Sequence, residues 1–244
     1  MVCERELPWR ERTASCCRDC WAALPKIETA KCRSCAQPLP VEPFSGVSSQ
    51  LSAPQRDPAQ TTDNRQPTTI LCLGCHENPL PVDWCDAWGE YRGPLERLVQ
   101  ALKFERHDFL DDALAKLLHE ILNARGDFAF DAIAAVPMSR TRERRRGYNQ
   151  AELLARALSL RTAIPCDMTL LAREGERATQ STLPKRARAA NVRGAFAASP
   201  RVNSKSILIV DDICTTGETL RACAAALRDA GAARVCAITV AKAS

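Results

Sequence analysis

Apolar residues in the middle of the chain recur at helical intervals. Those between residues 95 and 102 fall on a period of three to four residues, and those between 110 and 122 repeat it. Residues spaced in this way lie on one face of a helix, so two amphipathic helices are predicted. The same pattern over 149–160 predicts a third helix.

Short, continuous apolar runs lie between the helical segments and predict strands. One run covers 131–136, and another, Ser-Ile-Leu-Ile-Val, covers 206–210. Such aliphatic runs are typical of parallel strands buried on both faces. A helix from about 218 to 230 and a strand over 234–240 follow, which makes a crossover between parallel strands. We therefore predict an α/β fold whose ligand lies beyond the carboxyl ends of the strands.

Composition divides the chain into two parts. Nine of the 13 cysteines lie in the first 85 residues, where aliphatic runs are short, whereas 91–244 has the composition of an ordinary globular domain. Residues 42–69 are rich in Ser, Gln, Pro, Thr and Asp and have no hydrophobic period, which predicts a flexible or disordered insert. We expect a Cys-rich module at 1–85 that contains this insert, followed by a domain at 91–244.

The sequence contains no candidate for a membrane segment. No apolar run reaches the roughly 18 residues that a membrane helix needs, and the N-terminus is charged where a signal peptide would be apolar. A cytoplasmic protein without membrane insertion is predicted. In such a reducing compartment, paired cysteines are more often metal ligands or redox centres than disulfides.

Three Cys-x-x-Cys pairs follow one another in the first part of the chain. Two of them, separated by 11 residues, match a structural Cys₄ zinc site, in which the metal replaces a missing core. The third pair leaves the ligand set open, and redox-active thiols or an iron–sulfur cluster are alternative interpretations. The candidate metal ligands are Cys17, Cys20, Cys32, Cys35, Cys72 and Cys75.

The segment after the strand at 206–210 combines acidic and hydroxyl side chains. Asp211 and Asp212 can accept hydrogen bonds from a vicinal ribose diol, and the small turn into the next helix can aim N–H groups at a phosphate. An acidic strand end that only binds Mg²⁺, or a simple helix cap, is the alternative. The candidate ribose-phosphate ligands are Asp211, Asp212, Cys214, Thr215, Thr216, Gly217, Glu218 and Thr219.

Positive charge is concentrated in one stretch of the chain. Residues 140–193 contain 13 Lys and Arg against 5 Asp and Glu, and five of the seven residues from Arg140 to Arg146 are Arg. We expect an Arg-rich loop between a strand and a helix, able to neutralise a pyrophosphate or a nucleic acid backbone. A solvated face without a ligand is the alternative.

Two resemblances follow from these motifs. Val-Asp-Asp-x-x-Thr-Thr-Gly-x-Thr, beginning at Val210, is similar to the motif with which type I phosphoribosyltransferases bind phosphoribosyl pyrophosphate (PRPP) together with Mg²⁺. Joined to the cysteine pairs and the Arg-rich segment, it resembles the ComF family of competence-associated proteins. The resemblance implies a type I phosphoribosyltransferase-like parallel sheet flanked by helices, preceded by a small zinc-binding module.

The resemblance to the ComF family also implies a function and partners. It implies a role in handling incoming single-stranded DNA during natural transformation, with DNA-uptake helicase or recombination proteins as partners. The family commonly has four cysteine pairs, and this chain has only Cys3 in place of the first, which a misassigned start codon would explain. The expected zinc ligands are then Cys32, Cys35, Cys72 and Cys75, with Cys17 and Cys20 left incomplete. The residues implied on the pyrophosphate side are Lys103, Arg140, Arg146 and Gln180.

Two functions remain open at the level of sequence. The protein either transfers phosphoribose from PRPP to an unidentified acceptor, or uses the same site to hold a phosphoribosyl compound or a terminal nucleotide of DNA. Binding to DNA phosphates should weaken steeply with salt, whereas PRPP binding should depend on Mg²⁺ and on Asp211 and Asp212.

Overall fold

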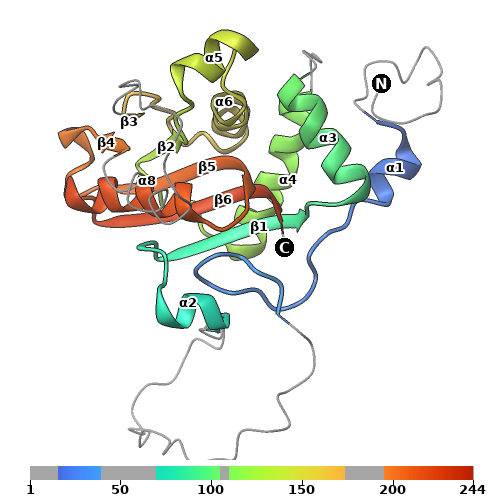
Figure 1. Ribbon diagram of the computed structural model, residues 1–244, viewed down its shortest axis with the longest axis horizontal. Helices are drawn as coiled ribbons and strands as arrows, with labels where there is room; N and C mark the ends of the chain where they lie inside the picture. The colour runs from blue at the N-terminus through green and yellow to red at the C-terminus, as the bar shows by residue number, and fades with distance from the viewer. Residues whose placement is uncertain (1–15, 40–69, 105–109, 174–194, 244) are drawn as a thin grey trace, which may run out of the picture.

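A four-stranded parallel sheet in the order β1-β6-β5-β2 forms the centre of the computed structural model (Figure 1). The structure describes residues 16–39, 70–104, 110–173 and 195–243. The strands are β1 (Trp84–Glu90), β2 (Ala132–Ala135), β5 (Ser206–Cys214) and β6 (Arg234–Lys242). This arrangement confirms the predicted parallel sheet.

Helices flank the sheet, and those predicted from hydrophobic period are confirmed. Helices α4 and α6 pack on each other and on the strands, and α8 packs on β5 and β6. A short antiparallel pair, β3 (Leu171–Arg173) with β4 (Phe196–Ala198), lies beside α8. The helices are α1 (Arg18–Ala22), α2 (Leu73–Glu77), α3 (Gly93–Phe104), α4 (Leu110–Arg125), α5 (Arg140–Arg146), α6 (Gln150–Thr162), α8 (Glu218–Asp229) and a 3₁₀ turn at Pro200–Val202.

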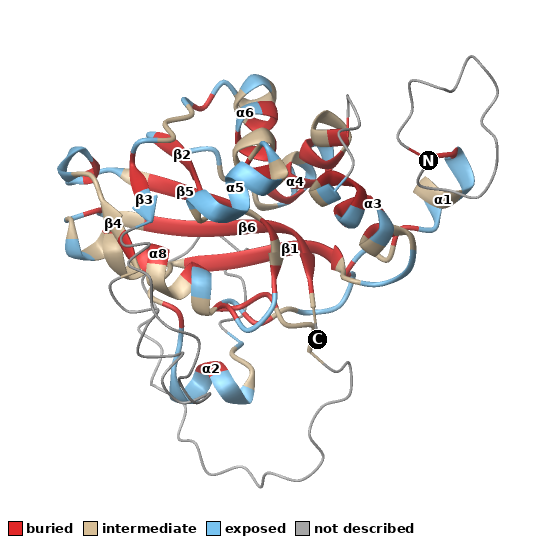
Figure 2. Ribbon diagram, turned by 45° about the horizontal axis from the view of Figure 1, so that its top comes forward, coloured by how far each residue is buried: buried red, intermediate tan, exposed pale blue. Residues whose placement is uncertain are grey.

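The two central strands form the core. Ile207 to Val210 are fully buried, and most of β6 is as well, as expected for strands covered on both faces (Figure 2). Register pairs Ile209 with Ala237 and Asp211 with Thr239. The acidic end of β5 therefore emerges from a rigid, dehydrated sheet.

The segment from Arg140 to Arg146 is a helix, so the expectation of a loop there is wrong. The Ser139 hydroxyl accepts a hydrogen bond from the Arg142 N–H at 3.4 Å, which caps the helix start. Gly147 ends the helix in the left-handed region, with φ 86°. Arginine is a good helix former, and a cap with a glycine stop is sufficient to define about two turns of helix.

Strand β1 was not foreseen. It carries Asp86 in its centre, and that carboxylate is 5% exposed, paired with Lys31 and with Arg125, whose Nη1 lies 3.1 Å away. Buried charges require such partners. Strand β1 starts at Trp84 and runs across the proposed boundary between residues 85 and 91. The division of the chain at this place stays a prediction.

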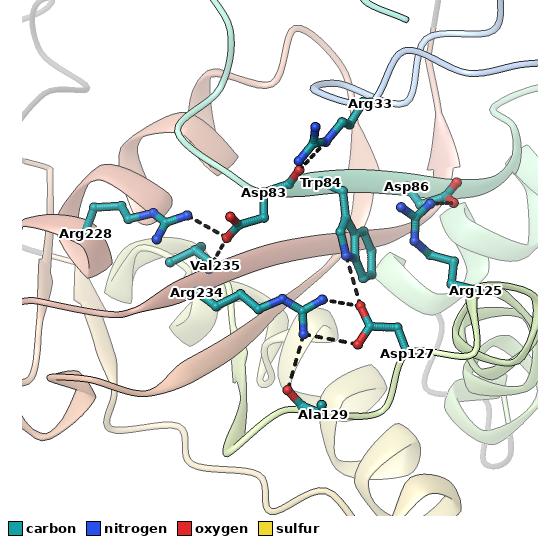
Figure 3. A network of polar contacts seen from close by, with 10 residues as sticks. All are labelled: Arg33, Asp83, Trp84, Asp86, Arg125, Asp127, Ala129, Arg228, Arg234 and Val235. Atoms are coloured by element: carbon teal, nitrogen blue, oxygen red, sulfur yellow. Dashed lines mark hydrogen bonds and ion pairs between the residues drawn. The ribbon is translucent and has the colours of Figure 1, made fainter. Parts of the chain in front are cut away.

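A polar network ties the Cys-rich segment to the sheet (Figure 3). Arg33 donates to the Asp83 carbonyl at 2.6 Å, and the Asp83 carboxylate accepts from Arg228 of α8 at 2.6 Å. Asp127 pairs with Arg234 at the start of β6 and accepts from the Trp84 indole at 3.1 Å. Among the described helices, none is both long and apolar enough to cross a membrane.

Candidate functional site

The carboxyl ends of the strands open into a cavity of about 510 Å³. Asp211 and Asp212 reach it from the end of β5, and Thr219 reaches it from the first turn of α8. Lys103 and Arg146 line the same cavity from α3 and α5. The cavity thus lies where parallel sheets usually bind their ligands.

The two carboxylates have different surroundings. Asp212 is 4% exposed and forms an ion pair with Lys103, whose Nζ lies 2.9 Å from its Oδ2. Burial raises the pKa of Asp211 well above its usual value, and the charge of Asp212 raises it further, while Lys103 acts in the opposite direction. A proton is therefore held at this pair more firmly than at an ordinary carboxylate.

Part of the cavity wall is cationic and aromatic. Arg146 donates to the Gln150 side chain at 2.6 Å, and its guanidinium lies 5.2 Å from the Phe104 ring centroid. Phe104 is 71% exposed, and Tyr91 lies near Lys103, at 6.0 Å from Nζ to the ring centroid. Such a wall can meet both an anion and a flat apolar group.

The loop from Cys214 to Thr219 separates this main cavity from a second one of about 560 Å³. Thr215, Thr216 and Glu218 line the second cavity, whereas Thr219 lines the first. Gly217 adopts φ 82°, and a Cβ there would meet Leu80 at 3.3 Å. The predicted ribose-phosphate residues are therefore distributed over the two sides of one turn.

Four of the predicted metal ligands come together as a cluster. The sulfur atoms of Cys32, Cys35, Cys72 and Cys75 all lie within 4.8 Å of one another. The sulfurs of Cys35 and Cys72 are 3.7 Å apart, close to the roughly 3.8 Å edge of a zinc–thiolate tetrahedron with bonds of about 2.3 Å. The cluster therefore fits Zn²⁺.

The thiols of this cluster differ in acidity. Burial raises the pKa of Cys35 and of Cys75. Burial also acts to raise the pKa of Cys32, but backbone N–H groups of Cys72, Cys35 and Ser34 outweigh it, so the net pKa lies below its usual value. A divalent cation would bind all four as thiolates and displace their protons.

Cys17 and Cys20 lie outside the four-sulfur cluster. They begin helix α1, where the Cys17 sulfur accepts a hydrogen bond from the Cys20 N–H at 3.4 Å. Their assignment as metal ligands stays a prediction, and Cys3 lies outside the described residues.

The cluster of four cysteines lies against the loop from Cys214 to Thr219, which we call the ligand loop. The Cys214 thiol donates to the Cys35 carbonyl at 3.6 Å. Arg221 of α8 donates to the Asn78 and Pro79 carbonyls, each at 2.7 Å. Contacts between segments this far apart in sequence could not be read from the motifs.

The remaining predicted residues have mixed outcomes. Lys103 and Arg146 line the main cavity, Arg140 is exposed at the start of α5 and is not among its lining residues, and Gln180 lies outside the described residues. Sequence reasoning missed Arg221, which donates to the Asn78 and Pro79 carbonyls, and Lys242, which donates to the Thr215 carbonyl of the loop. Contacts with backbone carbonyls leave no motif.

Comparisons with known proteins identify relatives of this chain. Residues 106–244 match the family described as the phosphoribosyl transferase domain. The chain is 35% identical to the DNA utilization protein YhgH of Escherichia coli K12 over 170 residues, 68% of this chain and 75% of that protein. It is 33% identical to Competence protein F of Haemophilus influenzae over 167 residues, 66% of this chain and 73% of that protein.

Among solved structures, the chain resembles a glutamine phosphoribosylpyrophosphate amidotransferase from B. subtilis. The identity is 21%, the TM-score is 0.40, and the match covers 57% of this chain and 30% of that chain. This likeness is too distant to carry an argument.

Proposed function

This chain belongs to the ComF family and contains its phosphoribosyl transferase domain, and on that premise we propose that the main cavity binds the ribose 5-phosphate group of PRPP. The observation that carries the proposal is that Asp211, Asp212 and Thr219 share one cavity with Lys103 and Arg146. The carboxylates suit a ribose diol, and the cations suit phosphates.

Each part of the ligand has a counterpart in the cavity. Asp211 and Asp212 accept hydrogen bonds from the two ribose hydroxyls, and the turn before α8 receives the 5-phosphate on its N–H groups. Lys103 and Arg146 face the pyrophosphate. The carboxylate oxygens also suit Mg²⁺, which would neutralise pyrophosphate charge when bound.

We further propose that the site acts in the handling of single-stranded DNA. Support comes from the names of the relatives, a DNA utilization protein and a competence protein, and from the exposed arginines of α5 beside the cavity. Guanidinium groups on a solvent-facing helix can contact a nucleic acid backbone next to a bound terminal nucleotide.

Transfer of phosphoribose to an acceptor in nucleotide metabolism is the second candidate function. It is favoured by Tyr91, Phe104 and Met138 in the cavity lining, which offer apolar contacts to a flat acceptor. The chain would act by positioning the reactants and by stabilising the leaving pyrophosphate with Lys103 and Arg146.

Calorimetric titration of Mg²⁺ and PRPP into zinc-loaded protein tests the main proposal. We expect binding, and at least about a tenfold weaker affinity in the Asp211→Asn, Asp212→Asn double variant, because the charged acceptors are lost. Asp229→Asn, at the far end of α8, is the matched control and should bind as the wild type does. Equal binding by all three proteins would exclude the acidic pair from the site.

A single-stranded oligonucleotide titrated at several salt concentrations separates the functions. A steep salt slope without PRPP binding would favour a fold reused for DNA handling. Binding of PRPP that requires Mg²⁺ would instead justify a search for the acceptor.

A further inference from the structure

Lys242 lies at the end of β6, directly behind the turn of the ligand loop. The residue is 4% exposed, and register places it beside Cys214 of β5. Its Nζ donates to the Thr215 carbonyl at 2.5 Å and to the Ala243 carbonyl at 2.6 Å. Both partners are uncharged carbonyls, and Lys242 also shares the second cavity with Cys35, Cys72 and Cys75.

A buried cation with neutral partners calls for an anion nearby. In the described part of the chain, Lys242 has no ion pair with a carboxylate, whereas Lys103, the cation in the main cavity, has Asp212. Burial of an unbalanced charge is unfavourable, and carbonyl dipoles offset only part of that cost. Lys242 therefore places a positive charge directly behind the loop, beside the cysteine cluster.

The direction of one peptide unit supplies the explanation. No cis peptide is present among the described residues, and in a trans peptide the C=O and N–H groups point in opposite directions. Because the Thr215 carbonyl points at Lys242, the N–H of Thr216 points to the other side of the loop. Lys242, Thr215 and Thr216 line the second cavity, and Thr219 at the end of the same loop lines the main cavity.

The ammonium of Lys242 also strengthens the Thr216 N–H as a hydrogen-bond donor. A charged hydrogen bond on the carbonyl oxygen polarises the whole peptide unit, which makes its N–H a stronger donor. Gly217, in the left-handed region at φ 82°, continues the turn and suits a concave set of N–H groups.

We propose that Lys242 is a positioning residue for the phosphate of the ligand. It orients the Thr215–Thr216 peptide toward the main cavity and supplies a positive charge behind the loop, without touching the ligand. The inference rests on the proposed binding of a ribose 5-phosphate group, and it names the residue that tunes this site for a dianion.

The test compares Lys242→Met and Lys242→Arg with the wild type, using ribose 5-phosphate as the probe. Lys205→Met, an exposed lysine at the opposite end of β5, is the control. We expect affinity to fall by about tenfold in Lys242→Met, to be largely retained in Lys242→Arg, and to be unchanged in the control.

Phosphorus NMR of the bound ligand provides a readout that a merely structural role would not move. The second pKa of a free phosphate monoester is about 6, and a cation behind the loop should lower it in the complex. We expect the bound phosphate to titrate at higher pH in Lys242→Met than in the wild type, with Lys242→Arg close to the wild type.

The outcomes are distinguishable. If the wild type does not bind ribose 5-phosphate, the proposed function fails. If the wild type binds and Lys242→Met binds equally well with the same phosphate pKa, the role of Lys242 fails alone. If Lys242→Met does not fold, Lys242→Arg provides the test. Weaker binding of ribose 5-phosphate by Lys242→Arg, with the phosphate pKa unchanged from the wild type, would also overturn the proposal.

Discussion

At the scale of a single residue, the protonation of Asp211 makes ligand binding at the site depend on pH. Its pKa is raised well above the usual value by burial first and by the charge of Asp212 second. A protonated carboxyl has lost part of its acceptor capacity and cannot take ribose hydroxyls or a cation as an ionised one does. Ligand binding should therefore compete with a proton.

We predict that the affinity for Mg²⁺ and PRPP increases with pH beyond the range in which an ordinary aspartate ionises, because the raised pKa of Asp211 delays the loss of its proton. Titration above about pH 7 keeps the phosphate groups fully ionised, so their own protonation does not contribute. In the ligand-free protein the folded state holds this proton more firmly than the unfolded state, so stability should decrease as pH rises from the unfolded pKa of about 4 to the raised pKa of the folded state. Asp211→Asn should lose this stability slope, and a slope that persists would contradict the assignment.

Asp127 shows the opposite shift. Burial acts to raise its pKa, but the hydrogen bond and charge of Arg234 outweigh burial, and the net pKa is lowered. The stabilising effect of this group is thus present above the unfolded pKa of about 4 and is lost as pH falls below it.

Asp127→Ala should lower the free energy of unfolding by about 2 kcal/mol at neutral pH, because the buried ends of Arg234 and Trp84 lose their acceptor. Urea unfolding at neutral pH and at about pH 3 measures it, and the difference between variant and wild type should shrink at acid pH. Asp229→Ala, at an exposed carboxylate, should have no such effect.

At the scale of a structural element, the conformation of the loop between β5 and α8 depends on one glycine. Gly217 has φ 82° and its missing Cβ faces Leu80 at 3.3 Å, whereas Gly93 has φ 56° with nothing within 4 Å. A side chain at either position strains the backbone, but only at Gly217 would it also press on the module behind the loop.

We predict that Gly217→Ala lowers stability by about 1–2 kcal/mol and also weakens ribose 5-phosphate binding. Gly93→Ala should lower stability to a similar or smaller extent with no change in affinity. Thermal unfolding and calorimetry separate the two effects, and equal affinity in both variants would show that the turn tolerates a Cβ.

Elements with a strong apolar period could be predicted from the sequence, and those set by tertiary contacts could not. The runs that became α3, α4, α6 and β5 carry their own signal. Strand β1 has an acid at its centre that is acceptable only because Lys31 and Arg125 reach it. The Arg140–Arg146 helix has its signal in Ser139 and Gly147, which a reading based on charge overlooks.

The candidate site was also predictable only where its residues belong to a local sequence motif. Asp211, Asp212 and Thr219 follow from a local motif, because a strand end and a helix start place them together. Spacing could not select which cysteine pairs meet, since Cys35 and Cys72 approach across a long insert. Arg221 and Lys242 bind backbone carbonyls, which every residue offers, so their partners had no sequence signal.

In the whole molecule, the Cys₄ cluster and the ligand loop share the second cavity. Cys35, Cys72 and Cys75 line it together with Thr215 and Thr216. A metal ion that fixes the cysteines would therefore also fix the surface on which the loop rests.

We predict that zinc removal with a chelator lowers both the unfolding temperature and the affinity for ribose 5-phosphate, and that added zinc restores both. Cys72→Ser should reproduce the loss, whereas Cys166→Ser, at a cysteine outside the cluster, should not. Loss of stability at unchanged affinity would show that the cluster supports the fold without supporting the loop.

The last described residues bear on how the protein can be labelled. The N–H of Ala243 donates to the Cys214 carbonyl at 3.0 Å, and its own carbonyl accepts from Lys242. An affinity tag or fluorescent protein fused directly after this strand would disturb these hydrogen bonds to the loop and weaken ligand binding. Fusions and surface tethers at the opposite end of the chain leave these two hydrogen bonds intact.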